Sequence, residues 1–170
     1  MTNTQKEIIR VAESYVGITE VGDNRGWISK TFEKAMRAVG FQYGQAWCAY
    51  FVETVWDEAI KDEKILEGIK RLFSGSTQKT YKNIKQNGFI YGLVLTKHPQ
   101  PGDIVIWQHR LKPWQGHAGI YLDSYSTKEM ITIEGNTSLK GSREGDGVYR
   151  KVRSMTRDGN LKVRGYITTI

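Results

Sequence analysis

The stretch Gln45-Ala46-Trp47-Cys48-Ala49-Tyr50-Phe51-Val52 contains the only cysteine among the 170 residues of this chain. Glycine and polar residues precede it, and an apolar pattern of helical period follows it, at Phe51, Val52, Val55, Trp56, Ala59 and Ile60. This pattern predicts that Cys48 lies where a loop enters a buried helix. Because the free N–H groups at a helix N-terminus stabilise an anion, such a position favours the nucleophilic thiolate form of cysteine.

The segments around this stretch also have helical patterns. Thr4 and Glu7 fit a capping box with Thr4 as N-cap and Glu7 at N3, and Gly17 is suited to the C-terminal end of that first helix. The apolar spacing predicts four more helices, at about residues 28–39, 48–61, 65–73 and 77–87.

The pattern changes after the turn signal at residues 99–102. Short strands are expected at residues 103–107, 118–122, 130–134, 147–153 and 161–168, with Asp158-Gly159-Asn160 as a hairpin turn between the last two. Helices first and strands second predict an α+β fold, with N-terminal helices packed on a C-terminal antiparallel sheet of about five strands.

The length and the apolar pattern limit the kind of protein. A chain of 170 residues predicts a single domain over residues 1–170. No stretch approaches the roughly 18 to 20 apolar residues of a membrane span, so no membrane insertion is expected. The polar N-terminus has no apolar signal region, so we expect no signal peptide and synthesis in the cytoplasm.

The charge and the cysteine count limit the partners. The formal net charge is +7, which favours polyanionic partners such as nucleic acid, anionic wall polymer or a membrane surface. The basic residues are scattered apart from the run at residues 150–153, and no nucleic-acid-binding signature is present, so no nucleic acid partner is expected. One cysteine excludes an internal disulfide and a multi-cysteine zinc site.

A second pair of chemically capable residues lies in the predicted strands. The loop expected at residues 123–128 joins two strands, and antiparallel pairing around it places His117 opposite Glu134 on one face, with Cβ atoms about 5 Å apart. An acid beside an imidazole fixes its tautomer and supports the imidazolium. Asn136 follows two residues later and points the same way if the strand continues. Together with Cys48, these residues form a possible nucleophile, base and orienter set.

Other interpretations remain open for each residue. Cys48 alone is typical of a small buried apolar residue. His117 is compatible with a strand-end histidine bonded to backbone, and Glu134 and Asn136 with turn residues. A metal site formed by His109, His117 and Glu134 is the other chemical possibility, but no metal-ligand spacing supports it, so we expect no metal and no other cofactor.

Three further features are candidates for substrate contact. Trp114 is predicted in a loop close to His117, where it is suited either to stacking on a sugar or peptide or to packing against the sheet. Trp47 is expected in the core or in a cleft wall. The glycine-flanked loop Asp23-Asn24-Arg25 is expected to line a cleft, but it lacks the spacing of a phosphate-binding loop.

Four ordered blocks carry a family resemblance. They are Trp47-Cys48-Ala49-Tyr50-Phe51-Val52, Pro101-Gly102-Asp103-Ile104-Val105-Ile106-Trp107, Gly116-His117-Ala118-Gly119-Ile120-Tyr121 and Glu134-Gly135-Asn136-Thr137. Together they resemble the CHAP family of cysteine, histidine-dependent amidohydrolases/peptidases, whose wider relatives are the NlpC-type peptidases and the papain-like fold. Residues 13–26 resemble the segment before the nucleophile in bacterial and phage cell-wall hydrolases, so the resemblance covers about residues 5–168.

The resemblance implies roles for the candidate residues. Cys48 corresponds to the nucleophile, His117 to the general base and acid, Glu134 to the orienting residue, and Asn136 to a nearby polar residue. The Cys48 backbone N–H and the Gln45 side chain are the candidate oxyanion donors. Some family members carry an acidic calcium loop before the nucleophile. Residues 41–47 contain no acid, so we expect no calcium here.

The resemblance also implies hydrolysis of amide bonds in peptidoglycan. Both an N-acetylmuramoyl-L-alanine amidase and an endopeptidase of the stem or cross-bridge peptide fit, in a phage lysin, an autolysin or an antibacterial effector. We expect a monomer that reaches the cell wall by release or by a route without a signal peptide. The alternatives are a papain-like protease, deamidase or transferase toxin that acts on protein, and a non-catalytic wall-binding module.

Overall fold

The computed structural model describes residues 1–138 and 145–170. Within these residues, five α-helices precede an antiparallel sheet of seven strands, which confirms the predicted α+β fold class. The sheet has two strands more than expected because β1 (Leu93–Thr96) and β6 (Arg157–Asp158) are too short to give an alternating pattern.

The helices are α1 (Asn3–Ser14), α2 (Lys30–Ala38), α3 (Cys48–Ala59), α4 (Glu63–Leu72) and α5 (Thr77–Asn87), followed by the 3-10 turn η1 (Gly88–Tyr91). The remaining strands are β2 (Ile104–His109), β3 (Gly116–Ser124), β4 (Glu129–Thr137), β5 (Gly147–Ser154) and β7 (Leu161–Thr169). Their order is β1-β7-β2-β3-β4-β5, and β6 pairs with β7.

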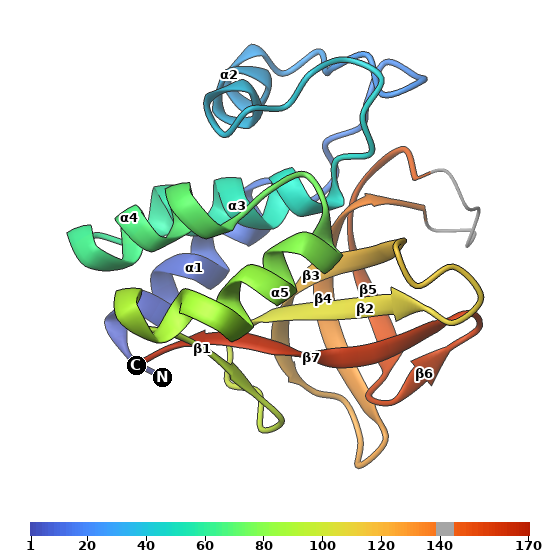
Figure 1. Ribbon diagram of the computed structural model, residues 1–170. Coiled ribbons are helices and arrows are strands. Elements are labelled where there is room, and N and C mark those ends of the chain that lie inside the picture. The colour runs from blue at the N-terminus through green and yellow to red at the C-terminus, as the bar shows by residue number, and fades with distance from the viewer. Residues whose placement is uncertain (139–144) are drawn as a thin grey trace.

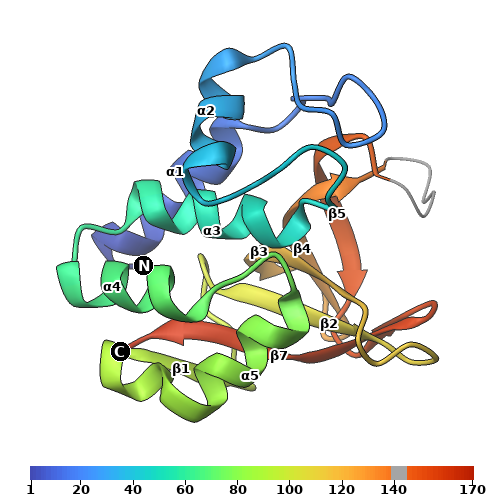
Figure 2. The ribbon, with the colours of Figure 1, turned by 45° about the horizontal axis from the view of Figure 1, so that its top comes forward.

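The helices and the sheet form two layers. Figure 1 shows the sheet strongly curved, with α1, α3 and α5 on one side of it, and both Figures 1 and 2 show α2 beyond α3 at one end of the molecule. The first core lies between these layers and includes Phe51, Val55, Ile104 and Ile106. It fixes α3 directly above the middle strands.

A second, smaller core fills the other face of the curved sheet. Its buried members are Val105, Trp107, Tyr121, Met130 and Tyr166. Successive residues of a strand point to opposite faces, so β2 contributes alternately to the two cores. Both faces of the middle strands are therefore buried, and a polar group placed there needs a hydrogen-bonding partner.

The first helix begins two residues earlier than predicted. Thr2 is the N-cap, its hydroxyl accepts from the Gln5 N–H, and the Gln5 side chain accepts from the Thr2 N–H. The capping box predicted at Thr4 is therefore wrong, because Thr2 and Gln5 have the same spacing two residues upstream. Glu7 instead forms an ion pair with Arg10.

Other element boundaries also differ from the prediction. The second helix starts at Lys30 because the Ser29 hydroxyl caps it by accepting from the Phe32 N–H, which leaves Ile28 outside the helix and 82% exposed. The turn after Asp158 joins β6 to β7, and not β5 to β7. The predicted helix at residues 77–87 is confirmed at both ends.

Candidate active site

Cys48 is the first residue of α3, as predicted, and the residues before it position the start of that helix. Trp47 is the N-cap but gives no side-chain cap. In the amide orientation that satisfies both of its groups, Asn136 accepts from the Trp47 N–H at 3.1 Å and donates to the Gly145 carbonyl at 3.2 Å. Asn136 therefore holds the chain that enters α3, and no hydrogen bond to His117 is formed by it in the described residues.

Close packing between α3 and β4 depends on Gly135. A Cβ atom at this position would lie 2.6 Å from ring atoms of both Phe51 and Trp47, so any larger residue would push the helix away from the strand. The absence of a side chain brings the start of α3 against the end of β4, which carries Glu134 and Asn136 on either side of the glycine.

The Cys48 thiol is 7% exposed and lies beside His117. Burial raises the pKa of the thiol, but the charge of His117, a hydrogen bond from its ring and hydrogen bonds from the Ala118 and Ala49 N–H groups together lower it below its usual value. The Ala49 N–H belongs to the first turn of α3, where N–H groups have no partner in the helix. The thiolate is thus stabilised by the helix end and by the imidazole.

His117 links Cys48 to Glu134. Its Nε2 lies 2.8 Å from Glu134 Oε2, which leaves Nδ1 as the ring nitrogen available to the thiol. The ring lies 5.5 Å from that of Trp107, centroid to centroid, so it is packed on the second core. Burial lowers the pKa of His117, but the Cys48 thiolate and the Glu134 carboxylate raise it to about 9. The geometry favours a thiolate–imidazolium pair near neutral pH.

The predicted contact between His117 and Glu134 is confirmed, but the predicted register is wrong. Ile120 pairs with Ile133, which places Glu134 opposite Gly119 and not opposite His117. A Cβ atom on Gly119 would lie 2.7 Å from Glu134 Cγ. Strand faces alternate with a period of two, so an error of two residues keeps both side chains on the same face, and the pair meets diagonally.

Glu134 is fully buried and accepts four hydrogen bonds. Oε1 accepts from Thr132 Oγ1 at 2.6 Å and from Arg153 Nε at 2.9 Å. Oε2 accepts from His117 Nε2 at 2.8 Å and from Arg153 Nη2 at 2.7 Å. Burial raises the pKa of this carboxyl, but the hydrogen bonds and charges of Arg153 and His117 hold it far below its usual value. Glu134 is therefore a carboxylate under all ordinary conditions.

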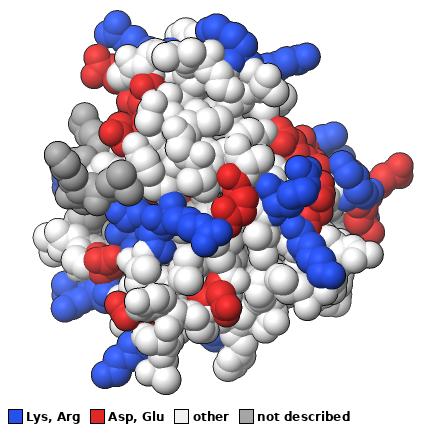
Figure 3. Space-filling view, turned by 180° about the vertical axis from the view of Figure 1, so that it is seen from behind, with Lys and Arg blue, Asp and Glu red and all other residues white. Residues whose placement is uncertain are grey.

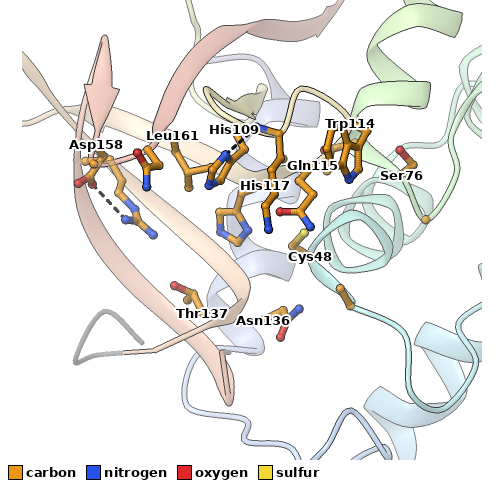
Figure 4. A pocket seen from close by; sticks show the side chains of 18 residues that line it. Cys48, Ser76, His109, Trp114, Gln115, His117, Asn136, Thr137, Asp158 and Leu161 are labelled. Carbon is orange, nitrogen blue, oxygen red and sulfur yellow. Dashed lines mark hydrogen bonds and ion pairs between the residues drawn. The ribbon is translucent and has the colours of Figure 1, made fainter. Parts of the chain in front are cut away.

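Cys48 and His117 open onto a cavity of about 860 Å³ (Figure 4), and Glu134 lies buried outside its walls. The start of α3, the start of α5, the β2–β3 loop, the end of β4 and the β6–β7 turn form its walls. Figure 4 shows Gln115 extending toward Cys48, Trp114 and Ser76 on one side of the pair, and His109, Leu161 and Asp158 on the other. The cavity thus extends to both sides of the thiol, as a site for a chain-like substrate requires.

The structure brings one of the predicted substrate residues to this cavity. Trp114 lines it and is 69% exposed. Asn136, predicted as a polar residue of the catalytic set, also lines it at the end of β4. Trp47 does not line it: the indole is fully buried against Trp27 and Phe32, and its Nε1 donates to Glu20 at 2.8 Å.

The structure does not bring Gln45 or the Asp23–Arg25 loop to the cavity walls. Gln45 is exposed, and its Oε1 accepts from the Gln42 N–H at 3.0 Å. The Asn24 carbonyl accepts from the Gly44 N–H at 2.8 Å. The loop therefore braces the segment that leads into α3, which is an indirect role and not the predicted cleft contact.

Sequence reasoning missed Arg153, Thr132 and Gln115. Arg153 belongs to the only basic run of the chain, but a charge run is typical of a solvated face, and its partner becomes clear only when β5 lies beside β4. Thr132 shares a strand face with Glu134, two residues away, which is the one signal in the sequence that links them.

His109 has a backbone role in the β2–β3 loop. Its Nδ1 accepts from the Leu111 and Lys112 N–H groups at 3.2 and 3.1 Å. Across the described parts of the chain, no group of three or more His, Cys, Asp or Glu side chains is arranged to hold a metal ion.

The family model of the CHAP domain matches residues 38–136, which is more than half of the chain. The chain belongs to the CHAP family. The matched segment contains Cys48, His117, Glu134 and Asn136 and ends before Arg153. No curated protein matches the sequence. Among the residues described, none of the helices is long and apolar enough to cross a membrane.

CHAP domains are typically hydrolases with amidase or peptidase activity on peptidoglycan. The observed fold, with helices on an antiparallel sheet, is consistent with the papain-like architecture of this CHAP domain.

Proposed function

We propose that this protein is a peptidoglycan hydrolase that cleaves an amide bond by a cysteine-thiolate acyl-enzyme mechanism. The observation that carries the proposal is the contiguous arrangement of Cys48, His117 and Glu134 in a CHAP domain, with Cys48 and His117 at the wall of the cavity and Glu134 buried behind His117. Each member has the partner that its role requires: a base beside the nucleophile and a carboxylate beside the base.

The first half of the reaction begins from the thiolate–imidazolium pair. Cys48 Sγ attacks the amide carbonyl carbon, and the carbonyl oxygen becomes an oxyanion. His117 then donates its Nδ1 proton to the leaving amine nitrogen as the C–N bond breaks, which leaves a thioester on Cys48. Glu134 accepts from Nε2 throughout, so it keeps the ring oriented and supports the positive charge on it.

The oxyanion requires preorganised donors. The Cys48 backbone N–H is the first, because it lies at the start of α3 and has no partner in the helix. Gln115 is better placed than Gln45 to supply the second, since its side chain lines the cavity and extends toward Cys48 in Figure 4. In the second half, His117 takes a proton from water, hydroxide attacks the thioester carbonyl, and the thiolate leaves.

Substrate contact is proposed for the cavity walls. Trp114 offers an exposed aromatic face for a sugar ring or a stem peptide, and Asn136 offers an amide at the opposite wall. Figure 3 shows Lys and Arg interspersed with Asp and Glu on one face of the molecule. The net charge of +7 would favour association with anionic wall polymers.

We also propose that residues 1–170 act as one catalytic domain, although the family match covers only the middle of the chain. Backbone hydrogen bonds join Gly17 to Val148 and Val148 to Ile18, and Arg150 forms an ion pair with Glu13. The segments before and after the matched residues are thus joined by hydrogen bonds and an ion pair. The protein would act as a monomer on the cell wall.

The test is hydrolysis of purified peptidoglycan by the wild type, Cys48→Ala and His117→Ala, with mass spectrometry of the released fragments. We expect both variants to lose activity while keeping the wild-type circular dichroism spectrum. New N-termini on alanine would show amidase activity, and cleaved stem or cross-bridge peptides would show endopeptidase activity. Near wild-type hydrolysis by folded Cys48→Ala would overturn the mechanism.

A protein substrate and a wall-binding role predict other outcomes. A protein-directed protease would leave muropeptides intact, and a binding module would sediment with the wall without releasing fragments. Iodoacetamide should inactivate the enzyme and chelators should not. Inhibition by a chelator that added metal reverses would contradict the proposed cysteine chemistry.

A further inference from the structure

Among the Lys and Arg side chains of the described residues, Arg153 is the one that hydrogen-bonds to Glu134. Its guanidinium meets both carboxylate oxygens, through Nε at 2.9 Å and Nη2 at 2.7 Å. This is the two-point pairing that only arginine provides, and it fixes the plane of the carboxylate as well as its charge.

The guanidinium is itself held from two other directions. Nη1 donates to Asp158 at 3.0 Å, and the group lies 5.8 Å from the centre of the Trp107 ring. The side chain is 18% exposed, so water reaches little of it. Arg153 thus connects Glu134 to the β6–β7 turn, which forms one wall of the cavity.

Four groups of alternating charge follow one another through direct contacts: the Cys48 thiolate, the His117 imidazolium, the Glu134 carboxylate and the Arg153 guanidinium. The first three carry a net charge of −1 in a buried region. Arg153 brings that sum to zero. An uncompensated buried charge is costly, and the cheapest way to remove it is to bind a proton.

We propose that Arg153 is a positioning residue that holds Glu134 aligned and anionic and thereby keeps Cys48 and His117 in the reactive thiolate–imidazolium form. Arg153 does not touch the reacting atoms and acts through Glu134. The inference rests on the proposed function, and it concerns a residue outside the segment that the family model matches.

Other titratable groups near this chain of contacts are few. Asp158 faces Arg153 from β6, and Tyr121 and Tyr166 lie in the second core on β3 and β7. His109 lines the same cavity from the end of β2, with Nδ1 bound to backbone N–H groups. None of these side chains hydrogen-bonds to Glu134 in the described residues, so Arg153 is its main source of positive charge besides His117.

The single cysteine allows a direct test that needs no substrate. The rate of alkylation by iodoacetamide, measured against pH, reports the thiolate fraction of Cys48 alone. If Arg153→Met leaves the carboxylate uncompensated, an extra proton binds and the thiolate forms at higher pH. We expect the acid limb of the profile to move up by about one pH unit or more.

The matched control is Arg150→Met, on the same strand. Arg150 pairs with Glu13 on α1 and is 55% exposed, so its loss removes the same charge from a side chain that forms no ion pair with Glu134. We expect its alkylation profile to match that of the wild type. A folded Arg153→Met protein with an unchanged acid limb would overturn the inference.

The double variant Glu134→Gln/Arg153→Met tests whether Arg153 acts through Glu134. In the Glu134→Gln background no carboxylate needs compensation, so the further change Arg153→Met should leave the acid limb where Glu134→Gln alone puts it. A full shift in that background would show that Arg153 acts by another route and would overturn the inference.

Arg153→Lys keeps the charge but loses the two-point contact. We expect its alkylation profile to stay close to that of the wild type, while kcat on peptidoglycan falls by roughly 10-fold and KM changes little. If Arg153→Met does not fold, Arg153→Lys provides the test. A kcat of Arg153→Lys equal to that of the wild type at every pH would overturn the inference.

Failure of the proposed function gives a different result. Active Cys48→Ala would overturn the cysteine mechanism whatever the alkylation profiles show. Inactive Cys48→Ala together with coincident profiles of the wild type and folded Arg153→Met would overturn only the role of Arg153.

Discussion

Two buried glutamates of this protein have opposite ionisation. Glu134 on β4 accepts four hydrogen bonds, two of them from Arg153, and its pKa is held far below the usual range. Glu53 on α3 is 8% exposed, and its carboxyl forms no hydrogen bond or ion pair in the part of the chain that the structure describes. Burial and the nearby charge of Asp57 raise the pKa of Glu53 to about 8.

The difference shows that burial does not decide the charge of a carboxyl. Loss of water is the largest influence at both positions, and at both it favours the neutral acid. At Glu134, donors on two neighbouring strands reverse that preference. At Glu53, a second acid four residues along the helix strengthens it. The surroundings of Glu134 stabilise the charged carboxylate, and those of Glu53 favour the neutral acid.

The largest expected effect comes from Glu134→Gln, compared with Glu53→Gln. The first replaces a carboxylate that supports the imidazolium, and we expect kcat/KM on peptidoglycan to fall on the order of 10²-fold, less than for His117→Ala. The second replaces a neutral acid by a neutral amide of the same size, so activity at pH 7 should stay within about 2-fold of the wild type. Equal losses in both variants would remove the distinction between the two sites.

A smaller loss is expected for Gly119→Ala. The new Cβ would lie 2.7 Å from Glu134 Cγ and 3.2 Å from the Ile133 carbonyl oxygen, so the glutamate side chain must shift. We expect about a 10-fold lower kcat and a free energy of unfolding lower by about 1–3 kcal/mol, measured by hydrolysis and urea denaturation.

Gly165→Ala on β7 is the matched control for this change. Its Cβ would meet only atoms at 3.3 Å or more, the nearest of them on the Tyr81 side chain. Activity should be close to that of the wild type. A Gly119→Ala enzyme with unchanged kcat would mean that the position of the carboxylate is not critical.

Thr132→Val removes one of the four donors to Glu134 and should have a modest effect. The lost hydrogen bond spans 2.6 Å to Oε1, the oxygen that does not contact His117. We expect kcat to fall by roughly 3- to 10-fold. Thr54→Val is the control, because the Thr54 hydroxyl bonds the Met36 sulfur away from the site. If Thr54→Val lost as much activity as Thr132→Val, both losses would be explained by changed packing and not by the hydrogen bond to Glu134.

The pH dependence of stability should separate the two glutamates without an activity assay. The pKa of Glu53 is about 8 in the folded protein and near 4.5 when unfolded. Between these values the folded state binds more protons, so stability falls as pH rises from 4.5 to 8. Glu53→Gln lacks this loss. Its free energy of unfolding, measured by urea denaturation, should therefore rise relative to that of the wild type between pH 5 and pH 8.

Asp57→Asn should also reduce the loss of stability between pH 5 and pH 8, by a smaller amount than Glu53→Gln. It removes the repelling charge near Glu53 but leaves the burial. The ionisation of Glu134 has the opposite effect on stability. The pKa of Glu134 is lowered in the folded protein, so the stability it contributes is present above about pH 4.5 and is lost as pH falls further. A wild-type curve that is parallel to that of Glu53→Gln from pH 5 to pH 8 would contradict the buried neutral acid.

The sequence by itself determined the helix start at Cys48 and the shared face of His117 and Glu134. Both rest on local periodicity, which has a period of 3.6 in a helix and 2 in a strand and survives small boundary errors. The predicted register between β3 and β4 was wrong. β3 extends to Ser124 and shifts register between Tyr121 and Asp123, and no local signal in the sequence shows such a shift.

Only the tertiary structure decided which groups surround the buried charges. The meeting of Arg153 with Glu134 requires β5 beside β4 in the register that pairs Met130 with Arg153, and the burial of Glu53 requires neighbours on nearly every side of α3. The ionisation of a side chain depends on charges and donors that are near in space, whatever their distance in the chain. The sequence therefore supplied the reactive residues, and the packing of distant strands and helices decided which of them carry a charge.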